Sequence, residues 1–199
     1  MQIDRSSTIQ EVCRLLSLGE QAQAEAVVSR DYPFAPTAKS GRSYTPREMT
    51  RVFLRDGFID RYKGTKLVYP PTLRVISKRL GKAFPYHKNG KMDSGHFAYW
   101  EVFPTIDHRK AVAHNGEDEE KNWVCCSMLT NSIKSHWTLE QLGWTLMPVG
   151  KLADWDGMIH WFVEQVENDK SLLDDAYIKS WFNAAKDVLR DMKLLTHAA

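Results

Sequence analysis

Residues 103–108 have the sequence Phe-Pro-Thr-Ile-Asp-His, and residues 123–126 have the sequence Trp-Val-Cys-Cys. β-Branched, aromatic and other apolar side chains dominate both stretches, which predicts a strand over 105–113 and a return strand over 123–126. The acidic loop between them contains Asn115-Gly116, so we expect a hairpin. A helix is predicted to follow, and this order of strand, loop, strand and helix decides the core of the fold.

The helix predicted after residue 126 has two chemically different faces. Helical spacing puts Asn131 and Lys134 on one side. The apolar side is expected to be the buried one, and it carries Leu129, Ile133, His136 and Trp137.

Polar residues recur at wide intervals around this core. Asp107-His108 ends the first strand, Asn122 follows His108 by 14 residues, and Asn131 follows it by 23. A single Asp-His pair is commonly a solvated surface pair. The spacing of the two asparagines is therefore what indicates a functional site.

The pattern resembles the motif of the HNH endonuclease family. That motif runs from Asp-His through a Gly-containing loop to an Asn, then to a helical His or Asn that often has a Lys three residues later. The matching residues are Asp107-His108, Asn115-Gly116, Asn122, Asn131 and Lys134. The resemblance implies a ββα-metal (HNH) core within an α+β, predominantly helical fold, with helices flanking the core at both ends.

A second stretch, residues 55–64, resembles the zinc knuckle of the same family. Asp60 and Lys63 stand where the knuckle has two cysteines, and Ser127 and Thr130 fall at the second pair. The resemblance therefore implies a variant without structural zinc. The helical flanks and tryptophans are expected to replace the metal's contribution to folding.

Phosphodiester hydrolysis explains why these residue types are needed. A base must take a proton from water, and a cation must neutralise the phosphate and the leaving oxygen. His108 suits the base, because the ordinary pKa of imidazole lies near neutrality. Asp107 and Asn131 offer the oxygen ligands that Mg²⁺ prefers, and Mn²⁺ or another divalent ion is an alternative. Adjacent strand residues point to opposite faces, so Asp107 and His108 serve one site only if the strand bends or ends there.

The resemblance also assigns roles to the remaining positions. It implies that Asn122 pins the loop and orients His108, and that Lys134 approaches a phosphate from the helix. Arg109 and Lys110 stand where the family has aliphatic residues. These two charges have two alternative interpretations: they contact DNA, or they perturb the site.

The charge of the chain is unevenly distributed along its 199 residues. The net charge is +2, but residues 38–110 hold 16 basic and 6 acidic side chains, a net charge of +10. Such a segment favours a polyanionic partner, although a solvated Lys/Arg surface gives the same count. We expect region 46–82 to contact the phosphate backbone, with Arg74 and Lys78 on a basic helix face.

Outside this core, the sequence predicts mostly helices. The expected segments are an N-terminal helical segment (1–37), a nuclease core (38–150) and a C-terminal helical cap (151–199), together one compact unit. A capping box is predicted at residues 8–11 and another at 45–48. Further expectations are a linker arm over 31–44, a short hairpin over 58–69, a helix opened by Pro70-Pro71, a buried aromatic strand over 97–103, and two apolar helical stripes in 155–192.

These observations predict a metal-dependent endonuclease that cuts DNA, most readily double-stranded DNA. The alternative is a catalytically inactive nucleic-acid-binding protein with an HNH-like fold, and a third hypothesis is a helical protein that binds a partner protein. A homodimer is one option, because a double-strand cutter needs two sites. No leader or membrane-spanning stretch is evident, and the three cysteines suit neither a disulfide framework nor a zinc pair, so we expect a cytoplasmic protein with no membrane partner.

Overall fold

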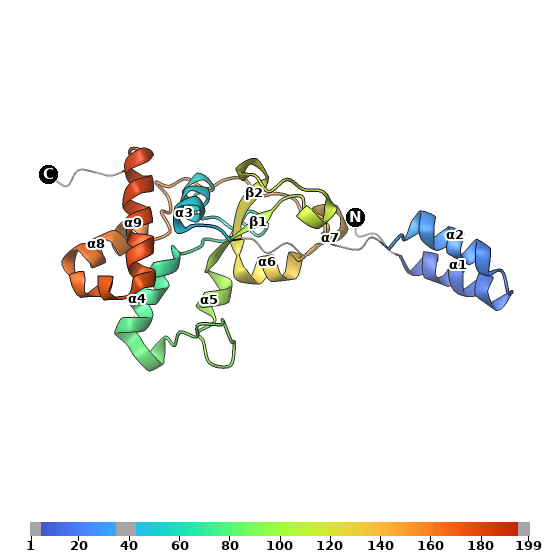
Figure 1. Cartoon of the computed structure of the whole chain (residues 1–199), viewed down its shortest axis with the longest axis horizontal. Helices are drawn as coiled ribbons and strands as arrows, with labels where there is room; N and C mark the ends of the chain where they lie inside the picture. The colour runs from blue at the N-terminus through green and yellow to red at the C-terminus, as the bar shows by residue number, and fades with distance from the viewer. Residues whose placement is uncertain (1–4, 35–42, 195–199) are drawn as a thin grey trace.

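The computed structural model describes residues 5–34 and 43–194. In this part the chain is predominantly helical and has one antiparallel pair of strands, which confirms the expected α+β class (Figure 1). The strands are β1 (Pro104–His108) and β2 (Trp123–Ser127). The helices are α1 (Ser6–Ser17), α2 (Gln21–Asp31), α3 (Pro46–Arg55), α4 (Pro70–Leu80), α5 (Ala98–Glu101), α6 (Met128–Lys134), α7 (Leu139–Leu142), α8 (Ile159–Asn168) and α9 (Ala176–Asp191). Single 3₁₀ turns occupy Gly81–Ala83, Val112–His114, Glu120–Asn122 and Lys170–Asp174.

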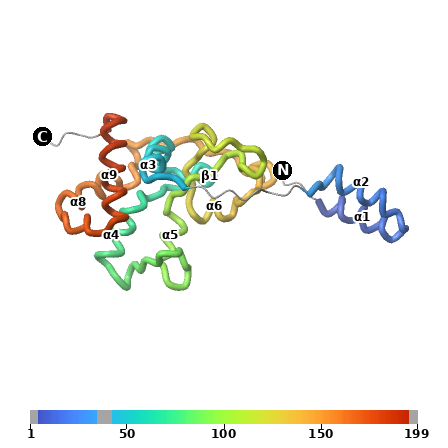
Figure 2. Tube along the Cα trace, viewed as in Figure 1, coloured from blue at the N-terminus to red at the C-terminus, as the bar shows by residue number. Residues whose placement is uncertain are grey.

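The first two helices form a hairpin that lies apart from the other helices (Figures 1 and 2). Leu15 and Ala24 are buried between them. The capping box predicted at residues 8–11 is wrong, because α1 already begins at Ser6 and Thr8 lies within its first turn. Residues 35–42, which belong to the predicted linker arm, lie outside the described residues.

Helix α3 begins as the sequence predicts. The Thr45 side chain accepts the backbone N–H of Glu48, and the Glu48 carboxylate accepts that of Thr45, which closes the capping box. The helix ends at Arg55, and Gly57 follows with a φ of +66°. A Cβ on Gly57 would lie 2.5 Å from the backbone of Gly150, so both the conformation and the close approach require glycine here.

One apolar core joins the strands to the C-terminal helices. Phe53 of α3 stacks on Trp181 of α9 at 6.5 Å between ring centroids, and the Tyr69 hydroxyl donates to the Trp181 carbonyl at 3.0 Å. The same buried cluster contains Ile106 of β1 and Phe162 of α8. The C-terminal apolar stripes therefore bury against this core within one chain.

The predicted hairpin over 58–69 is reduced to a single bridge between Ile59 and Lys66. The Asp60 carboxylate explains the difference. Its Oδ1 accepts the backbone N–H groups of Tyr62 and Lys63, at 2.9 and 3.1 Å, so the chain turns tightly where a strand would continue.

The aromatic run 97–103, predicted to be a buried strand, contains the short helix α5, and Phe97 is 57% exposed. Local and distant hydrogen bonds override the β propensity of these residues. His96 Nδ1 accepts the Ala98 N–H, while the Tyr99 hydroxyl donates to the Leu73 carbonyl and the Trp100 indole donates to the Gly90 carbonyl. None of the described helices is long and apolar enough to cross a membrane.

Candidate active site

The candidate site is built on β1, β2 and α6. The two strands pair with Asp107 opposite Val124 and His108 opposite Trp123. Strand β1 ends at His108, five residues before the predicted end, because the chain turns away into the loop. Helix α6 follows β2 directly and lies against both strands, and its N-cap Ser127 accepts the Thr130 N–H.

Helix α6 presents its polar side to the strands. Lys134 is fully buried, whereas Leu129 and Ile133 are 38% and 49% exposed. The prediction that the apolar side is buried is therefore wrong. The helix also ends at Lys134, so His136 and Trp137 lie beyond it. The buried carboxylate of Asp107 explains the orientation, because a buried charge needs a charged partner.

Asp107 is held by two donors in the interior. Its Oδ2 accepts the Tyr62 hydroxyl at 2.6 Å and the Lys134 ammonium at 2.8 Å. Lys134 Nζ also donates to the His108 carbonyl at 2.9 Å. Burial, and next the charge of Asp107, raise the pKa of Tyr62, so the phenol stays protonated and keeps donating. Lys134 thus neutralises Asp107 and does not extend toward a phosphate as predicted.

His108 belongs to a different set of contacts. Its Nε2 lies 2.7 Å from Oδ1 of Asp118, and the Trp123 indole donates to the same oxygen at 2.9 Å. Tyr44 packs on Trp123 at 4.9 Å between ring centroids and donates to Asp118 at 3.3 Å. His108 is only 4% exposed, so Asp118 and its neighbours fix the plane of its ring.

The geometry favours one tautomer of His108. Burial raises the pKa of Asp118, but the bonds from His108 and Trp123 outweigh it and hold that pKa below its ordinary value. The Trp123 indole also points at His108 Nε2, at 3.2 Å, but an unprotonated Nε2 would face the ionised Asp118 oxygen 2.7 Å away as a second acceptor. A proton on Nε2 avoids this clash and leaves the lone pair on Nδ1. Sequence analysis missed Asp118, because nothing distinguishes it from the other acidic residues of its loop.

Asn122 clamps the loop between the strands. Its Oδ1 accepts the Lys110 N–H at 3.0 Å, and its Nδ2 donates to the carbonyls of Lys110 and Glu117 at 2.9 and 2.8 Å. Gly116 allows this closure, because a Cβ there would lie 1.9 Å from the Lys110 carbonyl oxygen. Within the described part of the chain, the Asn122 side chain bonds to Lys110 and Glu117 and not to the His108 ring, so it orients the strand end rather than the imidazole.

Asn131 lies on the same face of β1 as Asp107. Its Nδ2 donates to Thr105 Oγ1 at 3.0 Å and to the Ile106 carbonyl at 3.3 Å. Strand β1 stays paired through His108, so Asp107 and His108 keep opposite faces, each with its own partners. The structure therefore joins Asp107, Asn131 and Lys134, and it separates them from His108. The described residues contain no group of three or more His, Cys, Asp or Glu side chains placed to hold a metal ion.

The positions that resemble zinc-knuckle ligands also meet. Asp60 is fully buried, and its Oδ2 accepts the Ser127 N–H at 2.9 Å, while Ser127 Oγ donates to Thr130 Oγ1 at 2.9 Å. Asp56, also buried, accepts the Cys125 N–H at 2.8 Å. Two carboxylates thus occupy the edge of β2 that faces away from β1, where they pair the N–H groups of an otherwise open edge.

The predicted DNA-contacting residues differ in their surroundings. Arg109 and Lys110 are exposed directly after His108. Arg74 and Lys78 instead approach Asp175, at 3.0 and 3.6 Å. Part of the +10 charge of residues 38–110 is therefore neutralised inside the molecule by the acidic C-terminal region.

Comparison of the chain with protein-family models, with curated proteins and with solved structures finds no match.

Proposed function

We propose that this protein is a metal-dependent endonuclease of the HNH type that hydrolyses phosphodiester bonds of DNA. The observation that carries the proposal is the contact between the buried His108 at the end of β1 and the exposed Asp118, 2.7 Å apart. A carboxylate that holds one imidazole nitrogen protonated leaves the other basic and stabilises the imidazolium that forms.

Further support comes from the order and packing of the elements around this pair. The antiparallel strands, the loop clamped by Asn122, and α6 with Asn131 and Lys134 on its inner face are what the HNH resemblance implies for a ββα core. The meeting of Asp60, Ser127 and Thr130 at the knuckle positions supports the variant without structural zinc.

In the proposed reaction, His108 Nδ1 takes a proton from a water molecule. The water oxygen then forms a bond to phosphorus, and the bond from phosphorus to the leaving oxygen breaks. Asp118 compensates the positive charge that His108 gains, and Asn122 fixes the end of β1 that carries it. Arg109 and Lys110, exposed beside His108, would contact flanking phosphates.

Asp107 and Asn131 are the residues that would hold the divalent metal, for which Mg²⁺ is the proposed ion. When bound, it would neutralise charge on the phosphate and on the leaving oxygen. The donor chemistry suits a hard cation, since both side chains offer oxygen on one face of β1. The Lys134 ammonium already occupies Oδ2 of Asp107, so an entering cation must compete with it.

Cleavage of supercoiled plasmid tests this proposal. We expect nicking in Mg²⁺ or Mn²⁺ that EDTA stops and that His108→Ala reduces at least 100-fold, in line with the usual contribution of a general base. The control is His160→Ala, which removes an exposed histidine of α8. Nicking by His108→Ala at the wild-type rate would refute the assignment of the base.

The alternative is a nucleic-acid-binding protein of the same fold without catalysis. The neutralised Asp107 and its separation from His108 favour this alternative. Its expected signature is retention of DNA that falls steeply with salt, without nicking in any divalent metal.

A further inference from the structure

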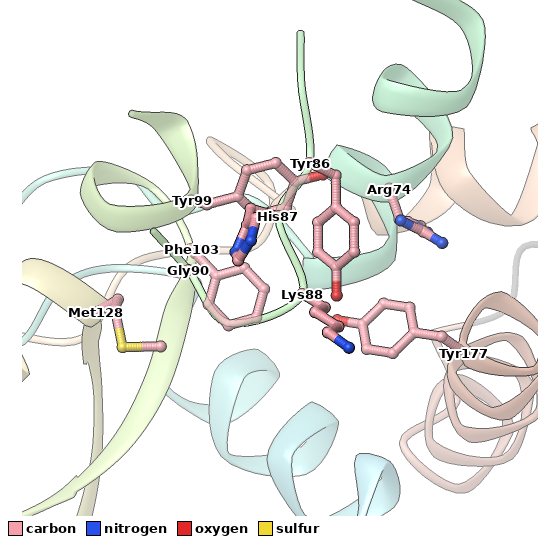
Figure 3. Close-up of a pocket in the computed structure, with 9 residues that line it drawn as sticks. All are labelled: Arg74, Tyr86, His87, Lys88, Gly90, Tyr99, Phe103, Met128 and Tyr177. Carbon is pink, nitrogen blue, oxygen red and sulfur yellow. The ribbon is translucent and has the colours of Figure 1, made fainter. Parts of the chain in front are cut away.

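A cavity of about 150 Å³ lies at the opposite end of β1 from His108 (Figure 3). Four aromatic rings line it, contributed by Tyr86, Tyr99, Phe103 and Tyr177. The cavity thus gathers residues from the loop after α4, from α5, from the segment before β1 and from α9. In another protein, an apolar cavity of about this volume binds benzene, so the space suits one six-membered ring.

The rings offer faces on which a flat ligand can stack. Tyr86 and Tyr99 stand 5.3 Å apart between centroids at 60°, and Tyr99 and Phe103 stand 6.3 Å apart at 39°. Tyr86 is 42% exposed and Tyr177 38% exposed, so these two rings are not fully used by the core. Aromatic faces of this kind stack on nucleobases with little regard to sequence.

The lining also supplies a directed hydrogen-bond donor. His87 Nδ1 accepts the Asn89 N–H at 3.2 Å, which places the ring proton of the neutral imidazole on Nε2. The tyrosine hydroxyls add groups that donate or accept. Together they can pair with the carbonyl oxygens and ring N–H of a pyrimidine.

Cations surround the cavity. The Arg74 guanidinium lies 4.2 Å over the Tyr86 ring, and Asp175 holds its Nε at 3.0 Å, so its plane is fixed. The loop carries three exposed lysines, and within the described part of the chain none of them has a carboxylate at ion-pair distance. These are Lys82, Lys88 and Lys91. Unpaired lysines beside a stacking site suit a phosphate backbone.

We propose that this cavity binds one unpaired pyrimidine base of a nucleic-acid strand, with the adjoining phosphate on the exposed Lys88. The inference deepens the proposed function, because it rests on a nucleic acid being the substrate. Phe103 and His108 are separated by five residues of β1, about 16 Å at strand rise. At 3.4 Å per step, the base would lie roughly five base pairs from the cut.

Binding to labelled DNA duplexes in EDTA tests the site without cleavage. One duplex carries an unpaired thymine, the second an abasic position at the same place, and the third is fully paired. We expect fluorescence anisotropy to show at least five-fold tighter binding of the unpaired thymine than of the other two, as stacking of one base implies. Equal affinity for the thymine and abasic duplexes would overturn the proposal.

Variants connect the preference to the cavity. Tyr86→Ala should remove the preference, and Tyr86→Phe should keep it because the stacking ring remains. Tyr32→Ala, which removes a tyrosine of similar exposure from the α1–α2 hairpin, should change nothing. If Tyr86→Ala still prefers the duplex with the unpaired thymine, the site is refuted. If the protein binds thymidine monophosphate saturably but shows no preference among the duplexes, the cavity binds a free nucleotide and the proposal is overturned.

The two proposals fail separately. Nicking that depends on His108, combined with no thymine preference, leaves the nuclease and removes the base pocket. A preference that depends on Tyr86, combined with no nicking, supports the pocket within the inactive DNA-binding alternative.

Discussion

At the scale of single residues, Asp107 and His108 show how neighbours in sequence acquire different chemistry. Asp107 faces inward, where Lys134 neutralises its charge and the Tyr62 hydroxyl donates to it. His108 faces the loop, where Asp118 makes its ring an oriented base. A metal held by Asp107 would therefore lie on the face of β1 opposite to His108. It would reach the side of His108 only if Lys134 released Asp107 and the end of β1 moved.

Replacing Lys134 tests this competition. Lys134→Met leaves Asp107 buried without its counter-charge, so we expect a loss of about 3–5 kcal/mol in unfolding free energy without metal. If Asp107 holds a metal, millimolar Mg²⁺ or Mn²⁺ should restore part of that loss. Urea denaturation with and without metal measures both effects, and Lys179→Met, on the exposed side of α9, is the control. A variant that loses stability and gains none from metal would argue against Asp107 as a ligand.

Asp175 gives a pH-dependent prediction at the same scale. Burial raises its pKa, but the hydrogen bond from Arg74, the charge of Arg74 and the first amides of α9 together outweigh burial, and the net pKa lies below its ordinary value. A lowered carboxyl pKa contributes stability that is fully present above the ordinary value of about 3.9 and is lost as the pH falls through the lower, folded value.

We therefore expect Asp175→Asn to cost about 1 kcal/mol at pH 7, because asparagine keeps the N-cap but not the charge. The difference from wild type should shrink as the pH falls below about 4. Denaturation at pH 3 to 7 measures it, with the exposed Asp187→Asn as the control. A deficit that stays constant down to pH 3 would contradict the lowered pKa.

At the scale of elements, a two-stranded sheet is marginal by itself and needs cover on its faces and edges. Helix α6 covers one face, and the core beneath α3 covers Ile106 and Cys125 on the other. The Asp56 and Asp60 carboxylates pair the free edge of β2. Hydrogen bonds to two buried carboxylates thus hold this edge of the sheet.

Removal of one carboxylate should expose this dependence. Asp60→Ala leaves two buried backbone N–H groups without their acceptor, those of Tyr62 and Ser127, while the Lys63 N–H keeps the Asp60 carbonyl at 3.2 Å. We expect a loss of about 3 kcal/mol or more in unfolding free energy, and a smaller loss for Asp60→Asn, which keeps one acceptor oxygen. Thermal denaturation measures both, and an Asp60→Ala melting temperature equal to wild type would refute the role.

The proposed correspondence of these positions to a zinc knuckle can be tested by introducing metal ligands. Cysteines at positions 60, 63, 127 and 130 form two Cys-x₂-Cys pairs on segments that already contact each other. A variant with Asp60→Cys, Lys63→Cys, Ser127→Cys and Thr130→Cys should bind one Zn²⁺ and give the visible absorption of tetrahedral Co²⁺. A double variant that carries only one of the two cysteine pairs should not bind Zn²⁺ in this way or give the Co²⁺ absorption. Metal binding by a double variant that equals that of the four-cysteine variant would show that the metal is bound elsewhere.

At the scale of the whole molecule, the C-terminal helices and the site region form one structure. Trp181 of α9 contacts Phe53 and Tyr69, and Arg74 reaches Asp175 at the start of α9. Among the described residues, the core cluster contains none from the α1–α2 hairpin. The two helices pack against each other, and the Arg5 guanidinium lies over the Tyr32 ring at 5.4 Å.

Deletion of residues 1–42 should therefore leave the melting temperature of the remaining chain within about 2 °C of that of the full chain. In a domain of this size, a change of about 1 kcal/mol in unfolding free energy would shift the melting temperature by more than this. The shortened chain keeps Tyr44, which packs on Trp123. Differential scanning calorimetry measures the transition. A large drop in melting temperature would show that the hairpin stabilises the core.

Features that depend on near neighbours could be predicted from the sequence. These are the capping box at Thr45, the helix opened by Pro70-Pro71 and the two strands around the acidic loop, since local hydrogen bonds and side-chain periodicity specify them. Contacts between distant residues instead set which face of α6 is buried, that Asp118 holds His108, and that residues 97–103 form no strand. The physical reason is that a buried charge or hydrogen bond depends on partners distant in sequence, such as Asp107 for Lys134 and Leu73 for Tyr99, and their energies exceed local propensity.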